Sequence, residues 1–251
     1  MKDSTKRFSN RVADYVRFRP RYPEGLIPLL RKEIGLDKSW TIADVGSGTG
    51  ISTEPFLKHG NAIVGIEPND EMRQAAESLL AQYPNFKSIN GTAEATGIEN
   101  GSVDAVIAGQ AFHWFDPEKS QTEYRRILKP GGWVILIWNR RLIDASAFSR
   151  DYEALLNTHG IDYAKVRHDH IDKGTITRFF ANGHQYRSLP NEQVFDFEGL
   201  RGRLLSSSYV PAEGQPGFAP MIEELKRIFE EHNESGRVRF DYETDIYFGR
   251  P

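Results

Sequence analysis

The sequence predicts one α/β domain built around a doubly wound, mostly parallel β-sheet. Short apolar runs bounded by turn residues alternate with helical stretches over residues 40–140, as expected for strands that are buried on both faces. Near the end of the chain, residues 237–250 alternate apolar and polar side chains with period two, which indicates an antiparallel strand at the edge of the sheet. The 251 residues suffice for one such domain with an insertion.

Each predicted element follows from its local pattern. Parallel strands are expected at the apolar runs 42–45, 62–66, 103–108 and 133–138, with a weaker strand at 86–90. Helices are expected after the N-cap Asn69 or Asp70 to about residue 82, after the N-cap Asp116 to about residue 128, at 148–159 and at 220–232. Strands and helices that alternate in this way join through right-handed crossovers into a doubly wound sheet.

Composition and charge exclude several classes of protein. Acidic residues outnumber basic residues by 35 to 32, so no strongly basic field attracts a nucleic acid. The absence of cysteine excludes disulfides and cysteine nucleophiles, and His168 and His170 lack a third ligand for a metal. No run approaches the roughly 20 apolar residues of a membrane span, and no signal-peptide pattern follows Met1. We therefore expect a cytoplasmic protein with no metal and no membrane or nucleic-acid partner.

A glycine-rich loop follows the first predicted strand. The residues Asp44-Val45-Gly46-Ser47-Gly48-Thr49-Gly50 leave that strand and open a helix, whose N-terminus carries a partial positive charge. Glycines at such a turn permit positive φ and let backbone N–H groups approach a ligand. Glu67 ends the second predicted strand beside this loop, where a carboxylate accepts hydrogen bonds from ribose hydroxyls. Loop and acid together predict a nucleoside-binding site.

Glycine spacing and the charge of Asp44 distinguish two classes of nucleoside cofactor. A dinucleotide site requires the spacing G-x-G-x-x-G, whereas Gly46, Gly48 and Gly50 follow G-x-G-x-G. Asp44 stands two residues before the first glycine, where a carboxylate repels a pyrophosphate and attracts a sulfonium or an aminium group. The charge therefore favours S-adenosylmethionine over a dinucleotide.

These motifs resemble those of the class I S-adenosylmethionine-dependent methyltransferases. The likeness is to the small-molecule branch with ubiquinone-biosynthesis-like and trans-aconitate-methyltransferase-like members, and it covers residues 8–140 well. Five segments in order carry it: the glycine loop, Gly65-Ile66-Glu67-Pro68, Gly91-Thr92-Ala93-Glu94, the stretch from Asp104 to Phe115, and Leu128-Lys129-Pro130-Gly131-Gly132.

The resemblance implies roles for particular residues of the cofactor site. Met72 would pack on the adenine, while the backbone near Ala93 and the side chain of Glu94 would contact the adenine edge. Tyr15 and Arg19 would close over the methionine end of the cofactor. The residues that we expect to bind S-adenosylmethionine are therefore Tyr15, Arg19, Asp44, Gly46, Gly48, Gly50, Glu67, Pro68, Met72, Ala93, Glu94 and Gln110.

The resemblance also implies a sheet of seven strands in the order 3-2-1-4-5-7-6, with the last strand antiparallel. His184–Phe195 then supplies the sixth strand, and residues 237–250 supply the seventh. Within a single domain of residues 1–251, we expect an N-terminal lid at 1–30, a cofactor-binding core at 40–140 and a helical cap at 198–235 that covers the substrate pocket.

Few catalytic side chains are needed, because the sulfonium group is already activated toward a nucleophile. His113 follows the fourth strand, and it is either the catalytic base for a hydroxyl acceptor or part of a packed pocket wall. Several arginines after the fifth strand and in the cap either recognise an anionic acceptor or are solvated: Arg140, Arg141, Arg201 and Arg203.

The resemblance thus implies an enzyme that transfers a methyl group from S-adenosylmethionine to a small-molecule acceptor by direct in-line displacement. If the arginines bind the acceptor, it is an anion. Two alternatives stay open on the sequence alone. One is a non-catalytic protein that binds S-adenosylmethionine or S-adenosylhomocysteine. The other is a nicotinamide-dependent oxidoreductase, which would bind NAD tightly and S-adenosylmethionine not at all.

Overall fold

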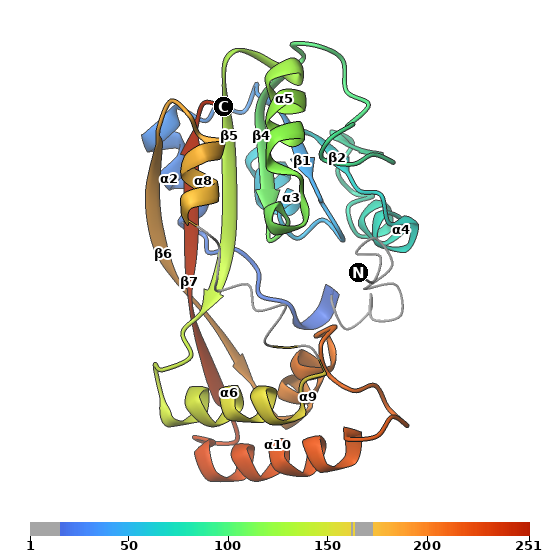
Figure 1. Cartoon of the computed structure of the whole chain (residues 1–251), viewed down its shortest axis with the longest axis vertical. Helices are drawn as coiled ribbons and strands as arrows, with labels where there is room; N and C mark the ends of the chain where they lie inside the picture. The colour runs from blue at the N-terminus through green and yellow to red at the C-terminus, as the bar shows by residue number, and fades with distance from the viewer. Residues whose placement is uncertain (1–15, 162, 164–172) are drawn as a thin grey trace.

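Seven strands form one mixed β-sheet (Figure 1). The structure is a computed structural model and describes residues 16–161, 163 and 173–251. The strands lie in the order β3-β2-β1-β4-β5-β7-β6, which confirms the expected order. Their bounds are β1 Thr41–Val45, β2 Ala62–Ile66, β3 Phe86–Ile89, β4 Val103–Gly109, β5 Leu128–Arg141, β6 His184–Phe195 and β7 Val238–Gly249.

The direction of the strands also agrees with the sequence prediction. Strand β1 pairs in parallel with β2 through Asp44↔Gly65 and with β4 through Asp44↔Ile107. The inner strands are buried on both faces, which explains their continuous apolar runs. Strand β7 runs antiparallel between β5 and β6. The expectation from its alternating pattern that it lies at the edge of the sheet is therefore wrong, because β6 pairs along its whole length and is the edge strand. The residues of β7 alternate between buried and more exposed from Val238 to Glu243, and from there to Gly249 they are buried on both faces.

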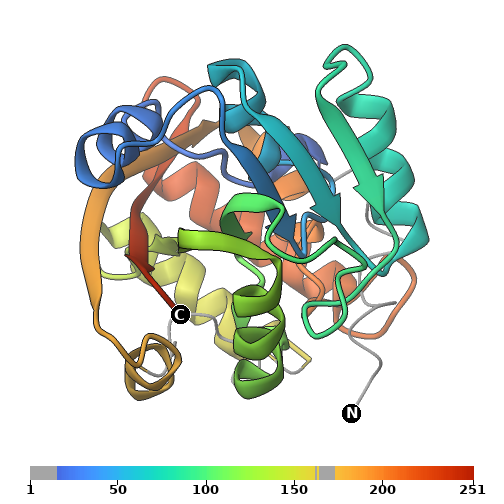
Figure 2. The same ribbon diagram turned by 90° about the horizontal axis from the view of Figure 1, so that it is seen from above.

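Helices cover both faces of the sheet (Figure 2). Helices α2 and α3 pack on one face, and helices α5 and α8 pack on the other, while α4 lies beside the edge strand β3. Their bounds are α2 Leu26–Ile34, α3 Thr53–His59, α4 Asp70–Leu79, α5 Pro117–Ile127 and α8 Lys173–Phe179. Among the described residues, no helix combines the length and the apolar character that crossing a membrane requires.

Side-chain caps set the beginnings of two helices as predicted. Asn69 caps α4 by accepting a hydrogen bond from Met72 N at 2.8 Å, and Asp116 caps α5 by accepting one from Lys119 N at 3.1 Å. The expected end of α4 near residue 82 is wrong. The helix ends at Leu79, because the chain then turns and Tyr83 N donates to Leu80 O at 2.9 Å.

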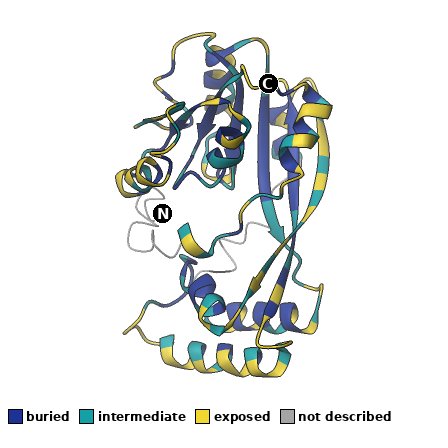
Figure 3. Cartoon of the chain, turned by 180° about the vertical axis from the view of Figure 1, so that it is seen from behind, coloured by how far each residue is buried: buried dark blue, intermediate teal, exposed yellow. Residues whose placement is uncertain are grey.

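Three helices form a separate layer beyond the carboxyl edge of the parallel strands (Figure 1). They are α6 (Ala147–His159), α9 (Phe197–Leu205) and α10 (Phe218–His232), and their apolar side chains pack around Phe240 of β7. The outer face of α10 is exposed, whereas the sides that face this small core are buried (Figure 3). This layer, which we call the cap, contains the predicted cap residues and also α6.

Strands β6 and β7 carry the cap. Each strand has 12 residues. Their pairing runs from His184↔Gly249 beside the sheet to Phe195↔Val238 within the cap. At about 3.3 Å per residue this ribbon spans roughly 40 Å, so one continuous ladder of hydrogen bonds joins the cap to the sheet.

Candidate functional site

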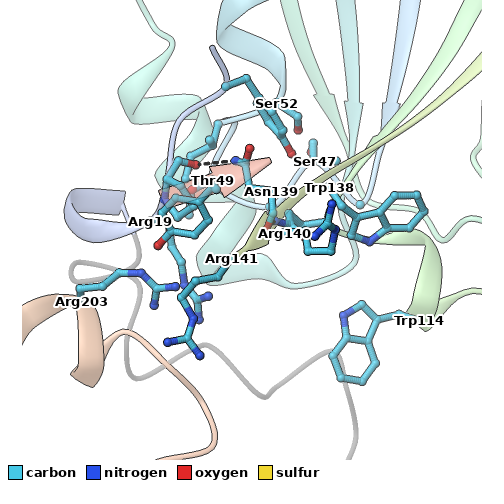
Figure 4. A pocket seen from close by; sticks show the side chains of 18 of the residues that line it. Arg19, Ser47, Thr49, Ser52, Trp114, Trp138, Asn139, Arg140, Arg141 and Arg203 are labelled. Atoms are coloured by element: carbon cyan, nitrogen blue, oxygen red, sulfur yellow. Dashed lines mark hydrogen bonds between the residues drawn. The ribbon is translucent and has the colours of Figure 1, made fainter. Parts of the chain in front are cut away.

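A cavity of about 160 Å³ lies between the carboxyl ends of the parallel strands and the cap (Figure 4). Its walls come from the glycine loop after β1, the ends of β4 and β5, the N-terminal segment and the cap. One water needs only about 10–15 Å³ on this scale, so the cavity accommodates a small organic ligand. Ligands of doubly wound sheets bind at this same edge.

The glycine loop forms one wall of the cavity. Gly46 and Gly48 have φ angles of 69° and 55°, a region in which residues with a side chain are strained. A Cβ on Gly46 would lie 2.6 Å from the Cβ of Ala111, and a Cβ on Gly50 would lie 2.6 Å from Cδ1 of Leu80. The positive φ angles of the three glycines therefore let the chain turn sharply, and at Gly46 and Gly50 neighbouring segments leave no room for a side chain.

Glu67 ties the end of β2 to the glycine loop. Its Oε2 accepts a hydrogen bond from Gly48 N, and its Oε1 accepts one from Asn69 N, both at 2.9 Å. The residue is only 9% exposed, and this burial raises the pKa of its carboxyl, although the two N–H groups oppose the shift. Each carboxylate oxygen keeps a further lone pair, so Glu67 retains the capacity to accept hydrogen bonds from ribose hydroxyls.

Asp44 is fully buried at the end of β1. Ser52 Oγ and Thr53 Oγ1 donate to its Oδ2 at 2.8 and 2.6 Å, while its Oδ1 has no hydrogen-bond partner among the described residues. Burial raises the pKa of Asp44 to about 6 in spite of these two bonds, and the charge of Glu67 adds to the rise. A cationic group placed near Asp44 would favour its ionised form.

Two hydroxyl groups of the glycine loop also lack a partner in the part of the chain that the structure describes. Ser47 and Thr49 line the cavity, and their Oγ and Oγ1 atoms are buried without a hydrogen bond to a described residue. Leaving such a group unpaired costs about 1–3 kcal/mol. A ligand that bears an amine and a carboxylate would satisfy these hydroxyls, whereas Asp44 and Glu67 lie behind the loop, outside the lining of the cavity. The loop therefore fits the methionine end of S-adenosylmethionine.

The end of β4 is held in an uncommon backbone conformation. Gln110 has a φ of 56°, which few residues other than glycine adopt, and such positions often lie at ligand sites. Its Nε2 donates to Asn139 O at 3.1 Å, which fixes the side chain at the end of β5. A Cβ on Gly109 would lie 2.5 Å from the Tyr22 hydroxyl, so the N-terminal segment passes directly across this strand end. Gln110, Asn139 and Tyr22 all line the cavity.

The residues expected around the adenine lie outside the lining of this cavity. Met72 is buried on α4, and its Cε lies 3.3 Å from the position of a Cβ on Gly48. Ala93 is buried, and Pro68 is half-buried. Glu94 Oε1 accepts a hydrogen bond from Asp116 N at 2.9 Å. Their adenine contacts thus stay predictions.

His113 is also outside the lining of the cavity. It is exposed on the short helix η3 (Phe112–Trp114), and its ring centroid lies 4.8 Å from that of Trp114. Trp114, unlike its neighbour, does line the cavity. The role of His113 as a catalytic base therefore stays a prediction, and the lining of the cavity does not support it.

Three residues discussed above, Tyr15, His168 and His170, lie outside the described residues. Within the described part of the chain, one group of side chains has the spacing of metal ligands: Asp151, Glu231 and His232 of the cap. His232 Nε2 lies 2.6 Å from Asp151 Oδ2 and so joins α10 to α6. This pair serves as a contact between two helices.

The sequence prediction missed residues that the fold brings to the cavity from separate segments: Trp138, Asn139, Tyr163 and Tyr242. Trp138 and Asn139 stand at the carboxyl end of β5, so the rule that ligands bind at strand ends was the available signal for them. Tyr163 has no local signal, because only the packing of the cap brings it to the cavity.

Comparison with known sequences gives the same class of protein. The family model described as a methyltransferase domain matches residues 43–136. An uncharacterised methyltransferase-like protein of Schizosaccharomyces pombe is 36% identical over 246 residues, which cover 95% of this chain and 93% of that protein. An uncharacterised methyltransferase of Mycobacterium tuberculosis is 35% identical over 144 residues, and the match spans only 56% of this chain and 55% of that protein.

Solved structures share the fold at lower sequence identity. A provisionally assigned type II methyltransferase from Anaeromyxobacter dehalogenans has a TM-score of 0.70 and 23% identity, covering 93% of this chain and 98% of that chain. The YcgJ protein of Bacillus subtilis has a TM-score of 0.54 and 19% identity, covering 90% and 98%. At these identities the likeness shows the fold alone.

A sheet of this strand order, with a glycine loop after β1, defines the class I methyltransferase fold. The match along nearly the whole length of a methyltransferase-like relative extends that assignment from fold to family. The chain belongs to the class I S-adenosylmethionine-dependent methyltransferases, and the methyl donor of that family is S-adenosylmethionine.

Proposed function

We propose that this enzyme methylates a small molecule bound in the cavity between the glycine loop and the cap. The observation that carries the proposal is the hydrogen bond of 2.9 Å between Glu67 Oε2 and Gly48 N. This bond holds an acid suited to the ribose directly beside a loop whose Ser47 and Thr49 line the cavity. The methionine end of the cofactor, which bears the methyl group, is then expected to face the cavity.

Each residue of the cofactor site has a task in this proposal. Glu67 accepts the ribose hydroxyls, Asp44 supplies negative charge for the amine and sulfonium, and the glycines expose the backbone of the loop. The side chains expected around the adenine are Pro68, Met72, Ala93 and Glu94. Arg19 and Gln110 line the cavity where the methionine end is expected.

The chain contributes alignment and exclusion of water to the transfer. When bound, S-adenosylmethionine supplies a methyl group whose carbon–sulfur bond breaks with the electron pair returning to sulfur. Gln110, fixed by its bond to Asn139, borders the space through which the acceptor approaches. The cap and the N-terminal segment enclose that space. An acceptor atom that is already nucleophilic needs no protein base for direct in-line displacement.

Calorimetric titration of the whole chain tests the cofactor assignment. We expect S-adenosylhomocysteine to bind and NADH to give no heat of binding. The reverse result would overturn the proposal in favour of an oxidoreductase. Incubation with methyl-labelled S-adenosylmethionine and a panel of small molecules then tests turnover. Transfer of label to at least one compound is expected, whereas tight binding with no transfer to any compound would favour a binding protein.

A further inference from the structure

Three arginines meet at the cap end of the cavity (Figure 4). Arg19 comes from the N-terminal segment, Arg141 from the end of β5 and Arg203 from α9. We call Arg19, Arg141 and Arg203 the arginine cluster. Arg140 also lines the cavity but is not a member, because two carboxylates of β7 bind its guanidinium group.

Among the residues that the structure describes, carboxylate groups neutralise only part of the positive charge of this cluster. Arg141 is paired with Glu153, whose Oε2 lies 2.5 Å from its Nη2. Arg203 is only 7% exposed, and in the described part of the chain it forms no ion pair. Its Nη1 donates to a neutral hydroxyl, Ser207 Oγ, at 3.2 Å. A buried guanidinium without a counter-ion is strongly unfavourable. Because no described carboxylate pairs with Arg203, an anionic ligand would complete this site.

Two N–H donors of the cluster are free to bind that anion. Arg203 Nε and Arg141 Nη1 are both buried, and within the described ranges of the chain neither has a hydrogen-bond partner. A planar guanidinium group presents its donors as a fork that matches the oxygens of a carboxylate or a phosphate. One oxyanion at this end of the cavity would therefore satisfy the two donors and the unbalanced charge together.

Tyr209 lines the same wall of the cavity, and the positive charge of the arginine cluster affects the pKa of its phenol. Burial alone would raise the pKa of its phenol, but the guanidinium groups of Arg203, Arg19 and Arg141 outweigh burial and lower that pKa below its ordinary value. A field that favours a buried phenolate also favours other oxyanions at the same place.

We propose that Arg141 and Arg203 of the arginine cluster anchor a carboxylate or phosphate group of the methyl acceptor. The inference rests on the proposed function and adds the substrate class, an anionic small molecule. An oxyanion whose lone pairs accept several N–H bonds is a weak nucleophile. The anchored group therefore positions the acceptor, and a different atom of the acceptor receives the methyl group.

Titration calorimetry on the whole chain tests this anchor, both without and with saturating S-adenosylhomocysteine. The probes are succinate, inorganic phosphate and the neutral analogue succinamide. We expect at least one anion to bind and succinamide not to bind. Arg203→Gln should weaken anion binding by about 10- to 100-fold, the range for loss of hydrogen bonds to a charged group. Arg201→Gln is the matched control, because Arg201 is on the same helix but outside the cavity lining.

The titrations distinguish a carboxylate anchor, a phosphate anchor and the absence of an anchor. Preference for succinate assigns a carboxylate anchor, and preference for phosphate assigns a phosphate anchor. The proposal is overturned if neither anion binds better than succinamide, or if Arg201→Gln and Arg203→Gln lose affinity equally. If Arg203→Gln does not fold, Arg203→Lys decides, since it keeps the charge and loses the fork; anion affinity equal to that of the unmodified chain would then contradict the anchor.

Failure of the cofactor assignment would look different. If S-adenosylhomocysteine does not bind, the proposed function fails, while the titrations without it still test the arginine cluster. If S-adenosylhomocysteine binds and the anions do not, the proposed function stands and only the anchor fails.

Discussion

Glu67 and Asp44 are both buried carboxylates, but their surroundings give them different properties. Backbone N–H groups bind both oxygens of Glu67, so its position is fixed beside the glycine loop. Among the described residues Asp44 keeps one oxygen without a partner, and because burial raises its pKa to about 6, a nearby positive charge would strengthen its ionisation. In the proposed function the first acid therefore positions the cofactor, and the second responds to its charge.

Replacement of Glu67 should weaken cofactor binding. A hydrogen bond to a charged group contributes about 1.5–3 kcal/mol, so we expect Glu67→Gln to lose about 10- to 100-fold in affinity for S-adenosylhomocysteine by calorimetry. Glu71→Gln, on the exposed side of α4, removes the same charge nearby and serves as the control. Equal affinities for the two variants would show that Glu67 does not hold the ribose.

The pKa of Asp44 predicts how cofactor binding depends on pH. Protonation below a pKa of about 6 removes the negative charge that attracts the sulfonium and the amine. Binding of that cation favours the ionised carboxylate, so affinity for S-adenosylmethionine should be constant above the pKa and fall as pH decreases through it, by at most about tenfold per pH unit. Calorimetry from about pH 5 to pH 8 measures this dependence. Asp44→Asn should bind weakly with a flat profile, and a flat profile in the unmodified chain would contradict the assignment.

How far the site could be predicted depends on how local its residues are. Short sequence motifs contain Asp44, the three glycines and Glu67, and the chemistry of these motifs can be predicted without a structure. In the structure, the hydrogen bond from Gly48 N to Glu67 joins the two motifs. Arg203 could be named as a candidate but not separated from Arg201. The two differ only in which side of α9 faces the cavity, and tertiary packing decides that.

At the scale of elements, the N-terminal segment and α9 fit closely against each other. A Cβ on Gly202 would lie 2.1 Å from Cε2 of Phe18, so the ring rests directly on the glycine. Arg19 Nη2 donates to Ser206 O at 3.0 Å, and Gln193 Nε2 donates to Phe18 O at 3.1 Å. These contacts hold the segment that carries Arg19 against the cap.

A double-mutant cycle measures this fit. In an exposed helix Gly→Ala raises the free energy of unfolding by about 1 kcal/mol, whereas overpacking lowers it by about 1–3 kcal/mol. At a distance of 2.1 Å the clash with Phe18 outweighs the gain in helix propensity. We expect Gly202→Ala to lower the free energy of unfolding in urea. In a Phe18→Ala background, where the ring is absent, the same change should be neutral or stabilising. Equal effects in both backgrounds would mean that the two residues do not interact.

The elements themselves differ in how well local pattern predicted them. Strand β6 begins at His184 and ends at Phe195, where the family resemblance and not a local pattern placed it. The helix of residues 148–159 was predicted, but its place in the cap was not. That place follows from the β6–β7 ribbon, which extends past the sheet and leaves the apolar face of α6 to pack on α10.

At the scale of the whole molecule, the site exists only where three parts meet. The sheet supplies the glycine loop, the cap supplies Arg203, and the N-terminal segment supplies Arg19. The cofactor and the acceptor are thus expected on opposite sides of one cavity, which in-line transfer requires. Charge has the same division, because acids lie beside the loop, while Arg203, which forms no ion pair with any described residue, lies beneath the cap.

A crystal structure of the chain with bound S-adenosylhomocysteine tests this account most directly. We predict the ribose hydroxyls within hydrogen-bond distance of Glu67, the amino group beside Asp44 and the glycine loop, and the sulfur facing the cavity toward the arginine cluster. A complex in which the ligand contacts neither Glu67 nor Asp44, or in which the sulfur points away from the cavity, would contradict it.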